Sequence, residues 1–92
     1  DDTSYQYGIE LNKIAKLQIK IGEYDEAEKN ITKSLTILDN FRRDEQKKVY
    51  LIQALETQAA LFGVKGLFDE AEDALSRSTR LIEKSDKITG LD

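Results

Sequence analysis

The sequence of 92 residues contains no cysteine, histidine, methionine, tryptophan or proline. Without cysteine the chain has no disulfide framework and no thiolate nucleophile, a composition that suits a reducing compartment. Without histidine it lacks the commonest general base and any imidazole metal ligand, which excludes Ser-His triads and imidazole-based zinc sites. We therefore expect a protein that is not an enzyme, that holds no metal or other cofactor, and that resides in the cytoplasm.

Long apolar runs and an excess of positive charge are also missing. No window approaches the roughly 20 apolar residues of a membrane-spanning helix. The net charge is −4, and charged residues of both signs, 35% of the chain, are mixed along its length. Binding to phosphate backbones needs a clear basic excess, so we expect neither a nucleic-acid nor a membrane partner. Because methionine is absent even at the first position, we expect a fragment of a longer protein.

The chain does contain a repeated phrase. Residues 22–28 read GEYDEAE and residues 66–72 read GLFDEAE, an offset of 44 residues. The same offset aligns other identical residues, among them Leu11/Leu55, Ala15/Ala59, Leu17/Leu61 and Ser34/Ser78. Self-similarity at a fixed period of this length indicates a repeat architecture. We expect a single domain over residues 1–92, with one repeat over about 4–40 and a second over about 44–84.

Apolar residues recur at spacings of three and four between the two glycine turns, which predicts helices over about 4–21, 25–39, 44–64 and 69–84. The third of these is apolar over a broad arc, so we expect neighbours on more than one of its sides. Gly22 and Gly66 are predicted to close the preceding helices in a left-handed conformation. The fold class we expect is all-α, with two helix-turn-helix units stacked as a short right-handed α-solenoid.

The acidic residues of the repeated phrase have two interpretations. In the structural one, Asp25 is the N-cap of the second helix, Glu28 reaches back to it, and the negative charges lie at the positive end of the helix dipole. In the functional one, they bind a metal or act as an acid–base pair. A calcium loop needs alternating oxygen ligands over about twelve residues with a glycine between them, and the phrase lacks that spacing. We favour the structural interpretation, with the aromatic residue of the phrase packing the corner.

Two helices joined by a short glycine turn, with GxYxEA at the joint, resemble the tetratricopeptide repeat family. The residues that carry this resemblance are the large and small residues of the first helix, the glycine and aromatic residue of the turn, and the small residue of the second helix. They are Leu11, Ala15, Gly22, Tyr24 and Ala27 in the first repeat, and Leu55, Ala59, Gly66, Phe68 and Ala71 in the second.

The sequence also departs from the family pattern. Asp39 and Glu83 stand where a proline usually closes the repeat, and Gln18 and Gln58 occupy usually apolar positions. The period is 44 residues rather than 34. We expect the added residues, FRRDEQKKVY, to lengthen the third helix at its start, as in members that resemble kinesin light chain repeats.

The resemblance implies binding rather than catalysis, on a concave surface lined by the first helix of each repeat. A peptide or a helix of a protein partner would occupy it. By position, the first helix presents Ile9, Asn12, Lys13, Lys16, Ile19 and Lys20, and the third helix presents Tyr50, Gln53, Glu56, Thr57 and Ala60. The family's carboxylate clamp is not matched, because Asn12 stands where it has lysine and Lys16 where it has asparagine. We expect no binding of chaperone tails.

Other interpretations stay open at this point. Lys13, Lys16 and Lys20 share one helical stripe, which suits an acidic peptide or simply a solvated face. The stretch RRDEQKK at 42–48 suits an anion patch or a solvated turn. Because about three repeats are usually needed for stability, exposed edge helices favour a structural or self-assembling segment that forms homo-oligomers. The chain also suits an accessory helical domain of a multidomain regulator or enzyme.

Overall fold

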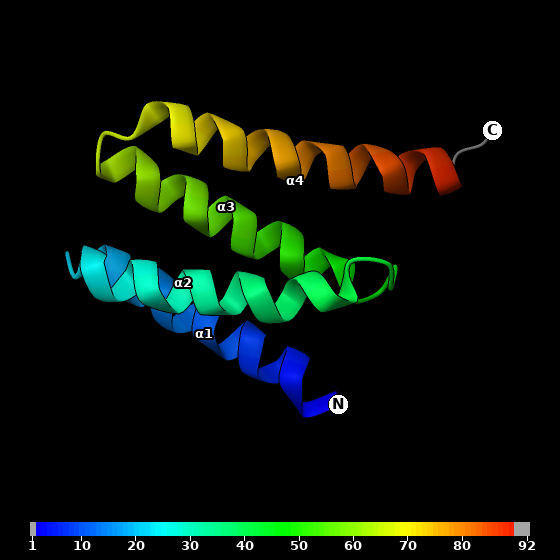
Figure 1. The fold of residues 1–92 in the computed structure, drawn as a ribbon, viewed down its shortest axis with the longest axis horizontal. Coiled ribbons are helices and arrows are strands. Elements are labelled where there is room, and N and C mark those ends of the chain that lie inside the picture. The colour runs from blue at the N-terminus through cyan, green and yellow to red at the C-terminus, as the bar shows by residue number, and fades with distance from the viewer. Residues whose placement is uncertain (1, 90–92) are drawn as a thin grey trace.

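The computed structural model describes the backbone of residues 2–89 and the side chains of residues 4–84. In this part of the chain four α-helices follow one another, with a short 3-10 turn, η1, after the second. They are α1 (Asp2–Lys20), α2 (Tyr24–Leu38), η1 (Asp39–Phe41), α3 (Lys48–Val64) and α4 (Phe68–Thr89). Consecutive helices form hairpins, α1 with α2 and α3 with α4, and the hairpins pack on each other through α2 and α3 (Figure 1). The predicted all-α class is confirmed.

The two hairpins turn in the same way. Gly22 and Gly66 have φ angles of 85° and 80°, as predicted for left-handed glycines that end a helix. The N–H groups of Glu23 and Leu67 each donate to the carbonyl five residues earlier, at 2.8 Å in both turns. This is the Schellman arrangement, in which a glycine satisfies the last carbonyls of a helix. The offset of 44 residues therefore relates two copies of one backbone turn, and the fold is repeat-like.

α3 lies in the middle of the molecule, as its broad apolar arc predicts. It contacts α1 and α2 on one side and α4 on the other. Leu51, Ala54, Leu55 and Leu61 of α3 are all at most 2% exposed. They form one cluster with apolar residues of the neighbouring helices, namely Ala15, Ala27, Ile31, Leu38 and Leu81. Within residues 2–89 the helices fall short of the length and apolar character that crossing a membrane requires.

The predicted lengthening of the third helix at its start is wrong. Residues 39–47 form η1 and turns, and α3 begins only at Lys48. The carboxylate of Asp44 accepts hydrogen bonds from the N–H groups of Gln46 and Lys47, at 2.9 and 3.1 Å, and holds these residues in a turn that leads into α3. Phe41 packs against Tyr5 of α1 with ring centroids 5.6 Å apart. The added residues are thus a packed connection between the hairpins.

The start of α2 also differs from the prediction. α2 begins at Tyr24, and its N-cap is Glu23, which makes no side-chain capping bond, so Asp25 is not the cap. The tight turn provides the reason, since the carbonyl of Glu23 already accepts the N–H of Ala27 at 3.0 Å. Asp25 lies instead in the first turn, near the positive end of the helix.

Two further expectations need correction. Phe68 is 71% exposed and packs no corner, because nothing covers the outer side of α4 where this helix begins. Its counterpart Tyr24 is about half as exposed, at 37%. α4 continues through Thr89, five residues beyond the predicted end.

Candidate functional site

An open groove runs between α1 and α3 as two adjoining hollows that share Gln53. One hollow is lined by Lys16, Ile19, Lys20, Gln53, Glu56, Thr57 and Ala60. The other is lined by Gln6, Tyr7, Ile9, Glu10, Lys13, Tyr50 and Gln53. The structure thus brings every residue of the predicted concave surface to the groove lining except Asn12. We call this feature the α1–α3 groove.

Helical spacing explains why these side chains converge. Positions three or four apart lie on one face of a helix, so residues 9, 13, 16 and 20 form one line on α1 and residues 50, 53, 57 and 60 form another on α3. The two helices contact each other directly, which places the two lines side by side. The groove is therefore built from rigid helices rather than from loops.

The edge of the groove that α1 supplies is positively charged. Lys13 pairs with Glu10 at 3.4 Å, but both side chains are more than 60% exposed, so the pair is weak. Among the described residues no ion pair engages Lys16 or Lys20. Between the charges lie apolar surfaces, including Ile19 and Ala60 of the first hollow. This arrangement suits a ligand with carboxylates on one side and an apolar side chain on the other.

Asn12 and Thr57 are both buried, although the resemblance places them on the concave surface. Thr57 is 6% exposed and lies at the base of the first hollow, whereas Asn12 is 7% exposed and does not line the groove. The hydroxyl of Thr57 donates to the carbonyl of Gln53 at 3.1 Å. The Oδ1 atom of Asn12 is buried, and no group of the described residues donates to it. An acceptor without a partner is unusual inside a protein.

The polar residue at position 18 has a structural role. The amide of Asn30 in α2 donates to the Oε1 atom of Gln18 in α1 at 2.9 Å, in a half-buried position. This bond gives each amide a partner and joins the two helices of the first hairpin. It explains why position 18 is polar, where the family that the sequence resembles is usually apolar, without any role in ligand binding.

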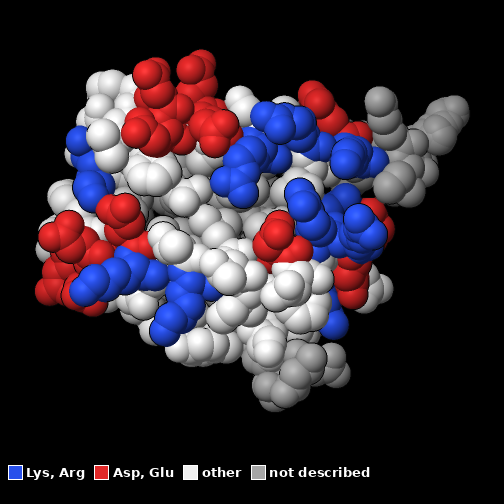
Figure 2. All heavy atoms as spheres, in the orientation of Figure 1, with Lys and Arg blue, Asp and Glu red and all other residues white. Residues whose placement is uncertain are grey.

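A basic cleft on another part of the surface combines Arg42, from the stretch 42–48 that suited an anion patch, with cations of α4 that the sequence analysis did not identify. It lies between α4 and the connection after α2, and its floor is apolar, formed by Leu51, Leu55 and Leu81. Its rim carries Asp39, Arg42, Arg77, Arg80 and Lys84. Figure 2 shows the blue side chains gathered over this end of α4 and the neighbouring connection.

The cations of this cleft are largely uncompensated. Arg42 contacts Asp39 at 3.5 Å, whereas no ion pair within the described side chains engages Arg77, Arg80 or Lys84. Guanidinium groups hold carboxylates and phosphates through paired hydrogen bonds, so the cleft is a second surface that suits anions. One feature of the sequence could have indicated this cleft. Arg77, Arg80 and Lys84 are spaced by three and four residues, which places them on one face of α4.

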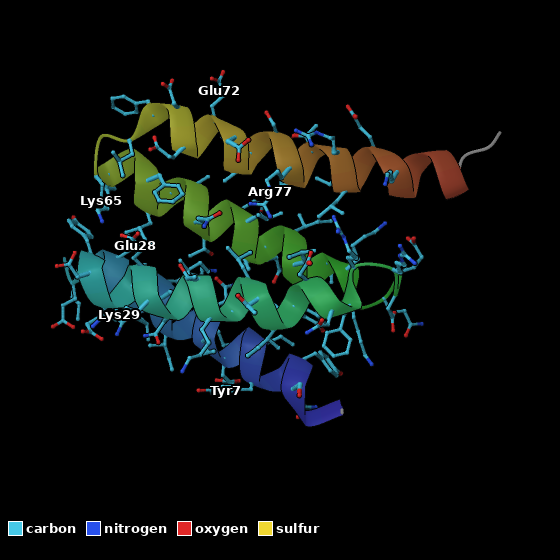
Figure 3. The ribbon with its side chains drawn as sticks, viewed as in Figure 1. Tyr7, Glu28, Lys29, Lys65, Glu72 and Arg77 are labelled. Carbon is cyan, nitrogen blue, oxygen red and sulfur yellow. The ribbon has the colours of Figure 1, made fainter. Side chains whose placement is uncertain are left out.

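One ion pair joins the two hairpins. The Nζ atom of Lys65, at the end of α3, lies 2.5 Å from Oε1 of Glu28 in α2, and the two residues face each other in Figure 3. The hydrogen bond to Glu28 raises the pKa of Lys65 above the ordinary value of 10.5, and the negative charges of Glu28 and Asp25 act in the same direction. Glu28, from the repeated acidic phrase, therefore contacts the next repeat.

Within the described residues, no three acidic side chains are placed to hold a metal ion together. Comparisons of this chain with family models, with curated proteins and with solved structures give no match.

Proposed function

We propose that this chain is a protein-interaction module of the tetratricopeptide type, a short right-handed α-solenoid whose α1–α3 groove binds an acidic peptide or partner helix. The observation that carries the proposal is the convergence of side chains from two repeats on one open groove. Ten residues chosen from the sequence for this role line it, and they come from α1 and α3 alike. The repeated backbone turn supports the family assignment.

The chemistry of the groove favours a ligand of mixed character. Carboxylates of the ligand would meet Lys16 and Lys20, which have no internal partner among the described residues. Apolar ligand side chains would bury Ile19, Ala60 and the ring of Tyr50. Exposed charges contribute modestly to affinity and more to the choice of partner and the rate of association, so the apolar contacts would supply most of the binding energy.

We propose binding rather than catalysis because the chain lacks both histidine and cysteine, the side chains that most often serve as general base and as thiolate nucleophile. The absence of cysteine also supports the cytoplasm as the compartment in which this module works.

A random library of twelve-residue peptides displayed on phage tests the proposal. Peptides enriched on the wild-type chain are synthesised with a fluorophore, and their affinity is measured by fluorescence anisotropy. We expect enrichment of acidic sequences that also carry leucine or aromatic residues. Lys16→Glu/Lys20→Glu should weaken their binding about tenfold or more, since two exposed charge contacts are together worth about 1–2 kcal/mol.

Two control variants carry the same change of charge elsewhere. Lys29→Glu/Lys33→Glu alters exposed positions on α2, and Arg77→Glu/Arg80→Glu alters the basic cleft. Both should bind the selected peptides as the wild type does. Loss of binding in the Arg77/Arg80 variant alone would move the peptide site to the basic cleft, and equal loss in all three variants would reduce it to nonspecific charge attraction.

A further inference from the structure

Each end of the stack exposes an apolar stripe on a single helix. On α1, Leu17 is 62% exposed and Tyr7, which also borders the α1–α3 groove, is 51% exposed, and Ile21, directly after the helix, is 69% exposed. On α4, Leu75 and Ile82 are 49% and 41% exposed, in line with the exposed Phe68. In Figure 3, Tyr7 and Glu72 mark these two helices at opposite edges of the molecule. We call the two surfaces the α1 outer face and the α4 outer face.

The interface between the hairpins shows what each outer face would pack against. The offset of 44 residues relates Leu17 to Leu61 of α3, which is 0% exposed, and Tyr7 to Leu51, which is 2% exposed. The α1 outer face is therefore the repeat equivalent of a face that α3 buries.

The same offset relates the α4 outer face to α2. Leu75 corresponds to Ile31, which is 0% exposed, and Ile82 corresponds to Leu38, which is 1% exposed. Both residues belong to the core cluster, which includes residues of α3. Because α4 packs on α3 as α2 packs on α1, the additional burial of Ile31 and Leu38 is what the next hairpin provides. One chain thus carries a copy of each half of its own internal interface, with the two copies at opposite ends.

We propose that a second copy of this chain packs its α1 outer face on the α4 outer face of the first, as α3 packs on α2. The contact joins two different surfaces, so association is head to tail and does not close after two copies. Because α3 lies beside both α2 and α1, the same geometry would place α1 of the next copy beside α3 and extend the α1–α3 groove from one copy into the next. The inference does not depend on what the groove binds.

Two differences between the interfaces affect how tight the contact is. Ile21 stands where the second repeat has Lys65, so the ion pair with Glu28 has no counterpart at Glu72. Glu10 stands where α3 has Ala54, which is fully buried, so the contact places a carboxylate in apolar surroundings. We therefore expect association that is weaker than the internal packing and that Glu10→Ala strengthens.

Sedimentation velocity over about 10 μM to 1 mM measures this association. We expect the wild type to sediment faster as concentration rises, and Glu10→Ala to lower the dissociation constant about fivefold or more. Glu26→Ala, which removes an equal charge from the exposed surface of α2, is the matched control and should leave the constant unchanged. Monomers throughout for both the wild type and Glu10→Ala would overturn the proposal.

Mixing two variants tests the head-to-tail geometry. Leu17→Asp disables the α1 outer face and Leu75→Asp disables the α4 outer face, and both positions are exposed, so neither change disturbs the fold of one copy. Each variant alone should remain monomeric, and an equimolar mixture should form dimers but nothing larger. Self-association of Leu17→Asp at wild-type strength would instead show pairing through two α4 helices and overturn the proposal.

A cross-link fixes the register. The chain has no cysteine, so single cysteines can be placed freely. Because Lys65 meets Glu28 through two long side chains inside the chain, Ile21→Cys in one copy should lie near Glu72→Cys in the other, and a short bismaleimide cross-linker added to their mixture should give mixed dimers. Ile21→Cys mixed with Lys29→Cys is the control and should give mixed dimers at only the random level. Equal yields in the two mixtures would contradict this register.

Discussion

The ammonium group of Lys65, the residue directly after α3, lies 2.5 Å from the carboxylate of Glu28 in α2 and joins the second hairpin to the first. Glu28 and Glu72 occupy the same place in the two copies of the acidic phrase. Glu72 points outward from α4 and has no ion-pair partner within the described side chains (Figure 3). One position of the repeat therefore forms a contact between hairpins in the first copy and an exposed charge in the second.

The Lys65–Glu28 ion pair should make part of the free energy of unfolding depend on pH. Because the pKa of Lys65 is raised in the folded chain, folding favours the protonated amine, and this contribution is fully present below the unfolded pKa of about 10.5. It is lost as the pH rises through the higher folded value. We expect Glu28→Gln to lower the melting temperature at pH 8, and the difference from wild type to shrink above pH 10.5.

Glu72→Gln is the matched control for that measurement, since it makes the same change at the equivalent position of the second repeat. It should leave the melting temperature nearly unchanged at both pH values. A Glu28→Gln deficit that stays constant up to pH 12 would show that Lys65 is not the partner that matters.

Two leucines at the same repeat position should respond very differently to truncation. Leu61 is fully buried, whereas Leu17 is 62% exposed. Leu61→Ala should lower the free energy of unfolding by about 2–5 kcal/mol, because it removes buried apolar contacts and leaves a cavity. Leu17→Ala should change it by about 0.5 kcal/mol or less, as exposed substitutions usually do. Urea denaturation at about 10 μM compares the two, and similar losses would mean that α1 is covered on its outer side.

Gly8 should resist replacement because α1 and α2 approach each other closely there. A Cβ atom at Gly8 would lie 2.9 Å from two side-chain carbons of Leu38, which is 1% exposed and has no room to move. Overpacking of this kind costs about 1–3 kcal/mol, more than the roughly 1 kcal/mol that alanine gains over glycine in a helix. We therefore expect Gly8→Ala to lower the free energy of unfolding by about 1 kcal/mol.

Gly63 provides the control for the helix-propensity gain. It also lies inside a helix, but a Cβ atom there would meet nothing within 4 Å. Gly63→Ala should raise the free energy of unfolding by about 0.5–1 kcal/mol. If both variants gained stability, the close packing of Gly8 against Leu38 would be disproved.

α1 and α2 are also joined by a hydrogen bond at the same glycine. The hydroxyl of Ser34 donates to the carbonyl of Gly8 at 2.6 Å, and Ser34 is fully buried. Ser34→Ala should cost about 1 kcal/mol of unfolding free energy, the usual net value of such a bond. Ser76→Ala, at an exposed position on α4, is the control and should change the free energy by a few tenths of a kcal/mol in denaturant titrations.

Features that depend only on residues close together in the sequence could be predicted from it. The left-handed glycines at 22 and 66 follow from the local phrase, and the apolar arc over residues 51–61 correctly predicted a central helix. The start of α3 could not be read in this way. It depends on Asp44 capturing two backbone N–H groups and on Phe41 packing against Tyr5, a residue 36 positions away.

The same distinction, between local and long-range causes, applies to the surfaces. The α1–α3 groove could be predicted in outline, because matching repeat positions identifies which residues face it. The burial of Asn12 could not, since it depends on the packing of the folded helices. The basic cleft joins Arg42 to a stretch of α4 that begins 35 residues later, and only the folded chain brings these cations together.

Amide chemical shifts measured while a selected acidic peptide is added to the isotopically labelled chain test the groove most directly. We expect the largest changes at Ile19, Gln53 and Ala60, with residues of α2 unaffected, and we expect Lys16→Glu/Lys20→Glu to need about tenfold more peptide to reach the same changes. Shifts confined to Arg77, Arg80 and Lys84, or to the outer faces of α1 and α4, would contradict the proposed peptide site.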